Sequence, residues 1–173
     1  MLAYVFVVLA AAVRFMPHPW HFTPIAASLL FFGAYGSRRQ VWFPVVLLAG
    51  SDVFLNKFIY HYPLSWDLLV TWLWYAAVVV LGSGLRRHLK VQWIMGSALA
   101  ASVSFFVLSN FAVWAAYDMY PKNFAGLMTS YAMAVPFFRG TLAGDLLFTA
   151  VLFAVPAVIK QFSESQSRGA TAA

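Results

Sequence analysis

The sequence has few charged side chains and no cysteine. Charged residues make up 9% of the 173 residues, whereas hydrophobic residues make up 63%. A soluble domain carries about 25% charged residues, so this chain has too few polar side chains to cover a surface in water. The absence of cysteine excludes disulfides, thiolate metal ligands and cysteine nucleophiles. The composition predicts an integral membrane protein with one domain and no separate soluble catalytic domain.

Enzyme motifs are absent as well. The sequence contains no Walker motif, HExxH, GxSxG or glycine-rich phosphate loop, and these absences exclude an ATPase and any recognisable hydrolase. The net charge of +6 comes from basic residues spread over loops that flank the apolar stretches. This distribution indicates topology signals and not nucleic-acid binding. We therefore expect a non-enzymatic protein without a cofactor, whose first partner is the lipid bilayer.

Six apolar stretches are separated by charges, prolines and turn residues. They cover residues 2–16, 24–36, 41–60, 66–85, 91–117 and 139–160. A membrane-spanning helix needs about 20 residues, so the pattern predicts an all-α polytopic membrane bundle of about six transmembrane helices, with 24–36 short for a span. A further apolar segment near 124–136, ended by Pro136, predicts a short interfacial or re-entrant helix. Residues 1–162 then form a single transmembrane domain, and the polar residues 163–173 a disordered cytoplasmic tail.

The basic loops predict the orientation of the bundle. With six spans, three basic segments fall on one side, which is the cytoplasmic side by the positive-inside rule. These segments contain Arg38 and Arg39, then Arg86, Arg87 and Lys90, and finally Lys160. The first apolar stretch lacks the basic residues that begin a signal peptide, so we expect it to be retained as a helix. Both termini are then cytoplasmic.

Polar side chains lie in the outer halves of the apolar stretches. An ionisable group within a span costs about 2.5–3.5 kcal/mol, so each one needs a partner, a water-filled cavity or a function. Arg14 and Arg139 are the natural countercharges for Asp52 and Asp145, and the sequence leaves the pairing open. Two interpretations follow: the charges are ion pairs that fix helix packing, or they line a solute site.

Aromatic side chains and histidines gather beside the outer loops. Aromatic walls with a few polar groups are typical of sites for small organic ligands. The candidate ligand-binding residues are Arg14, His18, Asp52, Asn110, Trp114, Tyr120, Tyr131, Phe138, Arg139 and Asp145. His18 and His21 are separated by Pro19 and Trp20, so no helical face presents them together, and we expect no metal site.

Short motifs are distributed over about residues 10–155. They are Arg14-x-x-Pro17, Phe22-Thr23-Pro24, Ser51-Asp52, Phe105-Phe106, Ser109-Asn110-Phe111, Trp114, Tyr120-Pro121, Gly126-Leu127, Tyr131, Pro136-Phe137-Phe138 and Gly144-Asp145. As a set they resemble an uncharacterised family of bacterial six-helix membrane proteins, DUF6580. The resemblance implies a multi-pass protein of the bacterial inner membrane.

The layout of that family is similar to the substrate-binding S components of energy-coupling-factor vitamin transporters. Those proteins have six helices, cytoplasmic termini and a site under the outer loops, which implies a vitamin-like or other small organic solute. Their first helix docks the coupling subunit through an AxxxA stripe. Here Ala3 is followed four residues later by Val7, and Val7 by Ala11. This departure favours a solitary transporter or a different partner subunit.

The leading hypothesis is a membrane protein that binds a small solute at a site open to the outer face and imports it. The alternative is a structural or accessory subunit of a membrane complex, with no solute of its own. A membrane enzyme that uses the outer Asp and His side chains is a third hypothesis.

Overall fold

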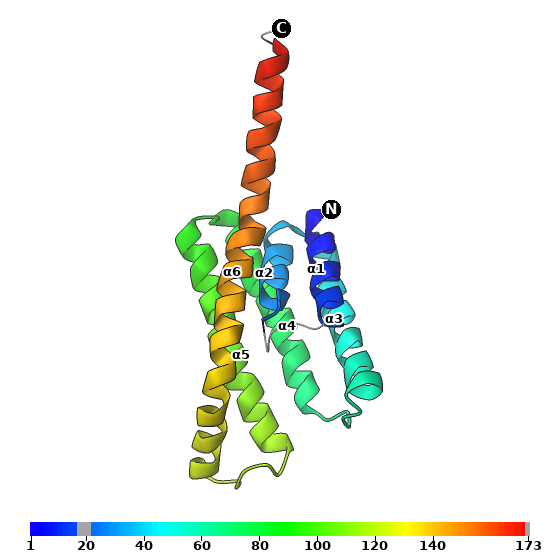
Figure 1. Cartoon of the computed structure of the whole chain (residues 1–173), viewed down its shortest axis with the longest axis vertical. Coiled ribbons are helices and arrows are strands. Elements are labelled where there is room, and N and C mark those ends of the chain that lie inside the picture. The colour runs from blue at the N-terminus through cyan, green and yellow to red at the C-terminus, as the bar shows by residue number, and fades with distance from the viewer. Residues whose placement is uncertain (17–21, 172–173) are drawn as a thin grey trace.

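The computed structural model describes residues 1–16 and 22–171, except for the side chains of 166–171 (Figure 1). Throughout these residues the regular structure is helical. The α-helices are α1 (Leu2–Val13), α2 (Ile25–Tyr35), α3 (Trp42–Phe54), α4 (Asp67–Gly84), α5 (Val91–Ala116) and α6 (Phe124–Thr171). Short turns accompany them: η1 (Arg38–Gln40), the π-helical η2 (Leu55–Ile59) and η3 (Leu85–Arg87). The predicted all-α bundle is confirmed.

Four helical segments are long and apolar enough to cross a membrane. They are Arg38–Ile59, Asp67–Arg87, Val91–Ala116 and Phe124–Ser165, as is consistent with a membrane protein. α1 and α2 have 12 and 11 residues. At 1.5 Å per residue they reach about 18 and 17 Å, against about 30 Å for the hydrocarbon core of a bilayer. The expected shortness of the second helix therefore also applies to the first, which ends at Val13.

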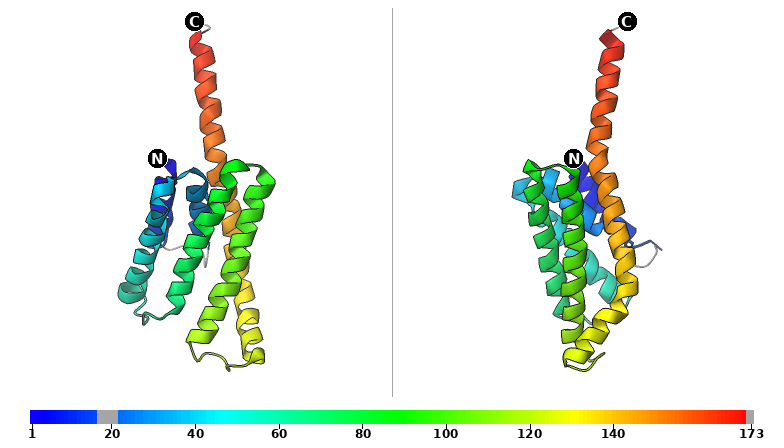
Figure 2. Two further views of the ribbon diagram at one scale, coloured as in Figure 1. Left: turned by 180° about the vertical axis from the view of Figure 1, so that it is seen from behind. Right: turned by 90° about the vertical axis from the view of Figure 1, so that its left-hand side faces the viewer.

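The predicted short helix near 124–136 is not a separate element. These residues form the first turns of α6, which continues through Pro136 and Pro156 to Thr171. The break expected at Pro136 is absent because a proline removes only one backbone donor, and a packed membrane helix tolerates this loss. The helix also includes 163–171, which the sequence predicts to be disordered. An ion pair of 3.8 Å between Lys160 and Glu164 joins successive turns there, and this part extends beyond the other helices (Figures 1 and 2).

The turns η1 and η3 place four arginines at one end of the bundle, which we call the basic end. Both termini lie on that side (Figure 1). Arg86 of η3 closes the end of α2, since its Nε donates to the Gly33 carbonyl at 2.8 Å and its Nη2 to the Gly36 carbonyl at 2.6 Å. A cation at the carboxyl end of a helix satisfies carbonyls that have no intrahelical partner. The opposite end, formed by η2, the start of α4 and the α5–α6 turn, is the far end.

α2 is the central helix of the half nearer the basic end. It contacts α1, α4, α5 and α6, and every residue from Ala26 to Ala34 is buried. α1 runs from the basic end into the bundle, and α2 returns to the same end (Figures 1 and 2). The two helices therefore fill one half of the bundle, while α3 to α6 extend to the far end.

Glycines allow α2 and α4 to approach closely. A Cβ atom on Gly33 would lie 2.2 Å from the Val79 carbonyl oxygen, and one on Gly82 would lie 2.3 Å from the Leu30 carbonyl oxygen. Small residues at helix crossings permit such backbone contact in membrane proteins. Neither position has room for a side chain, so the two glycines set the separation of α2 and α4.

We expect Gly82→Ala to reduce stability by about 1–3 kcal/mol, because the added methyl group forces the two backbones apart. Gly96→Ala is the matched control, since a Cβ there meets nothing within 4 Å and alanine favours the helix. The melting temperature of the purified chain in detergent measures both effects. A Gly82→Ala variant that melts at or above the wild-type temperature would contradict the close contact.

Candidate functional site

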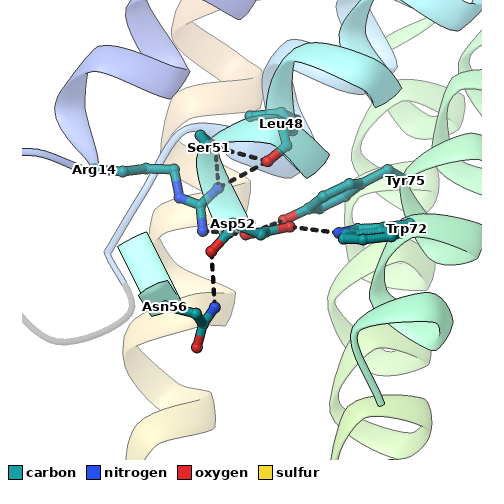
Figure 3. Close-up of polar contacts among 7 residues, drawn as sticks. All are labelled: Arg14, Leu48, Ser51, Asp52, Asn56, Trp72 and Tyr75. Atoms are coloured by element: carbon teal, nitrogen blue, oxygen red, sulfur yellow. Dashed lines mark hydrogen bonds and ion pairs between the residues drawn. The ribbon is translucent and has the colours of Figure 1, made fainter. Parts of the chain in front are cut away.

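A partly buried ion pair joins the end of α1 to the middle of the bundle (Figure 3). Arg14 directly follows α1, and its Nη2 donates a hydrogen bond to Oδ1 of Asp52 on α3. Asp52 is only 4% exposed. The sequence left open which arginine pairs with Asp52. In the structure this arginine is Arg14.

Two side chains of α4 complete the contacts of the Asp52 carboxylate. Trp72 Nε1 donates to Oδ2 at 3.0 Å, and the Tyr75 hydroxyl donates to Oδ1 at 3.4 Å. These residues are three positions apart and therefore lie on one face of the helix. Asn56 Nδ2 donates to the Asp52 backbone carbonyl at 2.9 Å. The carboxylate is held by three donors besides its own helix, which fixes its position between α1, α3 and α4.

The guanidinium of Arg14 contacts several groups of the protein. Nη1 donates to Ser51 Oγ and to the Leu48 carbonyl at 3.4 Å, and Nη2 donates to Asp52. A guanidinium has five N–H donors. Among the described residues, three of these donors have acceptors in Ser51, Leu48 and Asp52. The Tyr75 hydroxyl also interacts with the guanidinium. The cation is fixed and only partly buried, and it lines a cavity.

A cavity of about 980 Å³ lies beside the ion pair. Its lining includes both Arg14 and Asp52, and it combines apolar side chains with hydroxyl groups. The hydroxyl-bearing residues are Thr23, Tyr60, Tyr62, Thr71, Tyr75 and Thr141. Sites for small organic ligands typically have about 300–1,000 Å³ and a mostly apolar wall. The lining from η2 and the start of α4 shows that the cavity belongs to the half of the bundle toward the far end.

Several predicted site residues lie between α5 and α6, outside the cavity lining. Asn110 Nδ2 donates to the Phe106 carbonyl of its own helix at 2.7 Å. The Tyr131 hydroxyl donates to the Val107 carbonyl at 2.8 Å, and the Phe138 ring lies 4.7 Å from that of Phe106. The Tyr131 and Phe138 contacts join α6 to α5, whereas the Asn110 hydrogen bond lies within α5. The structure therefore does not bring Asn110, Tyr131 and Phe138 to Arg14 and Asp52.

Trp114 and Tyr120 lie at the α5–α6 turn. The Trp114 indole nitrogen donates to the Pro121 carbonyl at 3.0 Å, and the Lys122 ammonium lies 5.6 Å from the centre of its ring. The same ammonium donates to the Tyr117 carbonyl at 2.6 Å, which closes the carboxyl end of α5. Trp114 thus shapes the turn, and neither it nor Tyr120 lines the cavity.

The second ion pair that the sequence predicts among two arginines and two aspartates does not form. Arg139 is exposed on α6 and has no hydrogen bond or ion pair within the described part of the chain. Asp145 is 4% exposed and accepts a hydrogen bond from Ser102 Oγ of α5. The two residues are not three or four positions apart, the spacing that brings side chains of one helix together. His18, another predicted site residue, lies outside the described residues.

Sequence reasoning missed Trp72 and Tyr75, which complete the polar cluster. Both lie inside an apolar stretch, where their aromatic rings suggested contact with lipid or with other helices. A buried tryptophan or tyrosine usually finds a partner for its N–H or O–H group. The spacing of three residues between two such groups was the available signal, because it places both donors on one helix face.

We expect Asp52→Asn to lower the free energy of unfolding by about 3–5 kcal/mol, because it leaves the Arg14 guanidinium buried without a countercharge. Asp118→Asn is the control, since the Asp118 side chain is 99% exposed and surface changes stay within about 0.5 kcal/mol. Replacing Arg14 by Met in the Asp52→Asn background should recover part of the loss. Thermal unfolding of the three variants measures these effects, and equal melting of Asp52→Asn and Asp118→Asn would refute the structural role of the pair.

Comparison with known proteins gives one match. A family model described as "Family of unknown function (DUF6580)" matches residues 1–167. No curated protein and no solved structure matches the chain. The match extends from the first residue of α1 into the last turns of α6, so it includes every element that forms the cavity. The chain therefore belongs to the DUF6580 family.

Proposed function

We propose that this protein binds a small organic solute in the cavity beside Arg14 and Asp52 and imports it across the membrane. Ligand binding, and not only packing, is supported by one observation: the ion pair is not enclosed by the bundle. The Arg14 side chain keeps 16% of its surface exposed, against 5% for Asp52, and both line the cavity. An ion pair with a purely structural role has no need of an adjoining hollow of this size.

The orientation of import follows from the charges at the basic end. Short loops rich in arginine and lysine lie in the cytoplasm. With the basic end there, the cavity lies in the outer half of the membrane and both termini are cytoplasmic. α1 and α2 enter from the cytoplasmic side and turn within the bilayer. This topology suits the inner membrane of a bacterium and a multi-pass protein of six helices.

The lining indicates the chemistry of the solute. The guanidinium of Arg14 suits a carbonyl or carboxylate acceptor, and the hydroxyls of Thr71 and Thr141 add weaker polar contacts. Leu55, Leu68 and Phe105 supply apolar wall. Because Asp52 already balances the charge of Arg14, a neutral solute is accepted as well as a monoanion. The site therefore favours an amphipathic organic molecule, in keeping with the layout that the sequence led us to expect, that of vitamin-binding S components.

Release toward the cytoplasm requires a movement of helices. The half nearer the basic end is filled by buried side chains of α2, among them Leu29, Phe31 and Phe32. Transporters generally move one group of helices against another around a fixed site. A second membrane subunit is one source of such movement, and the proposal involves no covalent reaction and no cofactor.

A bulky side chain in the cavity tests the proposal. We expect Thr71→Trp to reduce the amount of co-purified small molecule at least tenfold in native mass spectrometry, because the indole fills space that the solute needs. Thr129→Trp is the matched control: Thr129 also lies in a helix, but it is exposed and outside the cavity lining.

Equal solute retention by the two variants would exclude this cavity as the binding site. A wild-type chain that carries no small molecule and is stable only together with another membrane protein would instead identify an accessory subunit.

A further inference from the structure

The bundle contains two buried aspartates with opposite surroundings. Asp52 and Asp145 are each 4% exposed. Asp52 has a guanidinium, an indole and a phenol as donors. Asp145 accepts one hydrogen bond, from the neutral hydroxyl of Ser102. Burying a carboxylate without a countercharge is far more costly than burying a paired one, so the two sites differ in how their charge is balanced.

The elements packed against α6 contain no cation near Asp145. α5 and α2 are its neighbours. α5 has no charged or titratable side chain, and the only titratable group of α2 is Tyr35, whose ring packs against Phe153. Phe22, before α2, contacts α6 at Gly144 and Phe148. On α6 itself, Arg139 is exposed. Among the described residues, nothing supplies a positive charge to Asp145.

A line of polar side chains connects Asp145 to the cavity. Thr141, Asp145 and Thr149 are four residues apart and therefore share one face of α6. Thr141 lines the cavity, and Asp145 is about 6 Å further along the helix. Beyond it, Thr149 is fully buried, and its hydroxyl has no hydrogen-bond partner in the described structure. A polar face thus extends from the cavity into the packed half of the bundle.

We propose that Asp145 is a proton-binding site inside the membrane, reached from the cavity along this face of α6. Oδ2 accepts the hydrogen bond from Ser102, and Oδ1 takes a proton from cavity water. This transfer makes the carboxyl group neutral. It converts the water molecule into a hydroxide ion, which the solvent neutralises. The proton returns to water when the carboxyl group becomes hydrated.

This site supplies a coupling ion for solute import. Thr141 touches the cavity one turn from Asp145, so a solute that moves α6 also changes the access of water to the carboxyl group. Ionisable groups in this position are typical of proton relays in transporters. Only this coupling step rests on the proposed function; the proton site itself stands without a solute.

Infrared difference spectroscopy of the full chain in lipid nanodiscs tests the proton site. At neutral pH we expect a C=O band from a protonated carboxyl group, which shifts in D₂O and is lost in Asp145→Asn. Asp118→Asn is the matched control and should keep the band, because the Asp118 side chain is 99% exposed and lies in the α5–α6 turn, away from Asp145. Ser102→Ala keeps the carboxyl group of Asp145, removes its hydrogen bond and should only shift the band, so it remains informative if Asp145→Asn fails to fold.

Three outcomes would overturn the proposal. The first is the absence of a protonated-carboxyl band that depends on Asp145. The second is the appearance of such a band only in His21→Gln, which would identify His21 as a countercharge. The third is a melting temperature that rises in NaCl over choline chloride at equal ionic strength and loses this rise in Asp145→Asn, which would indicate sodium. None of these measurements requires a solute. A negative result for the proton site is therefore distinct from a negative result for the proposed import.

Discussion

The shortness of the first two helices is the constraint on which the rest of the structure depends. α1 ends at Val13, so the next residue, Arg14, lies within the bundle and not at one of its ends. It meets α3 at Leu48 and Asp52, about 9–15 Å along that helix from Trp42. A guanidinium at this depth must be paired inside the protein. Asp52, Trp72 and Tyr75 follow from that requirement as one polar cluster.

The same shortness creates the cavity. α1 and α2 fill the half of the bundle near the basic end, where α2 packs tightly against α4 through Gly33 and Gly82. No other described helix takes their place toward the far end, and the hollow there is lined by α3 to α6 together with the residues that follow α1 and begin α2. The half near the basic end is tightly packed. The polar cluster of Arg14, Asp52, Trp72 and Tyr75 lies at the boundary between this half and the cavity. Helix packing and the proposed binding are therefore assigned to different halves of the bundle.

The sequence predicts the helices better than it predicts the site. Charge and hydropathy locate six helices, because each apolar stretch must be long enough to pack against other helices or to cross a membrane. The cost of burying a charge identifies Arg14 and Asp52. Depth alone, however, does not say which face of a helix a residue occupies. Asn110 and Tyr131 have a suitable depth but satisfy carbonyls of α5. Trp72 and Tyr75 are hidden among apolar neighbours until the packing of α4 against α3 is known.

The two buried aspartates show that residues of the same type and similar depth can have different surroundings. Both are buried acids in apolar helices, and sequence reasoning assigns an arginine to each. The backbone gives only Asp52 that partner, because Arg14 follows a helix that ends beside it, whereas Arg139 lies on another face of the helix that carries Asp145. Arg14 gives one carboxylate a fixed countercharge within the fold. The described residues give the other only the hydroxyl of Ser102, and for this reason the proton binding that we propose concerns Asp145 and not Asp52.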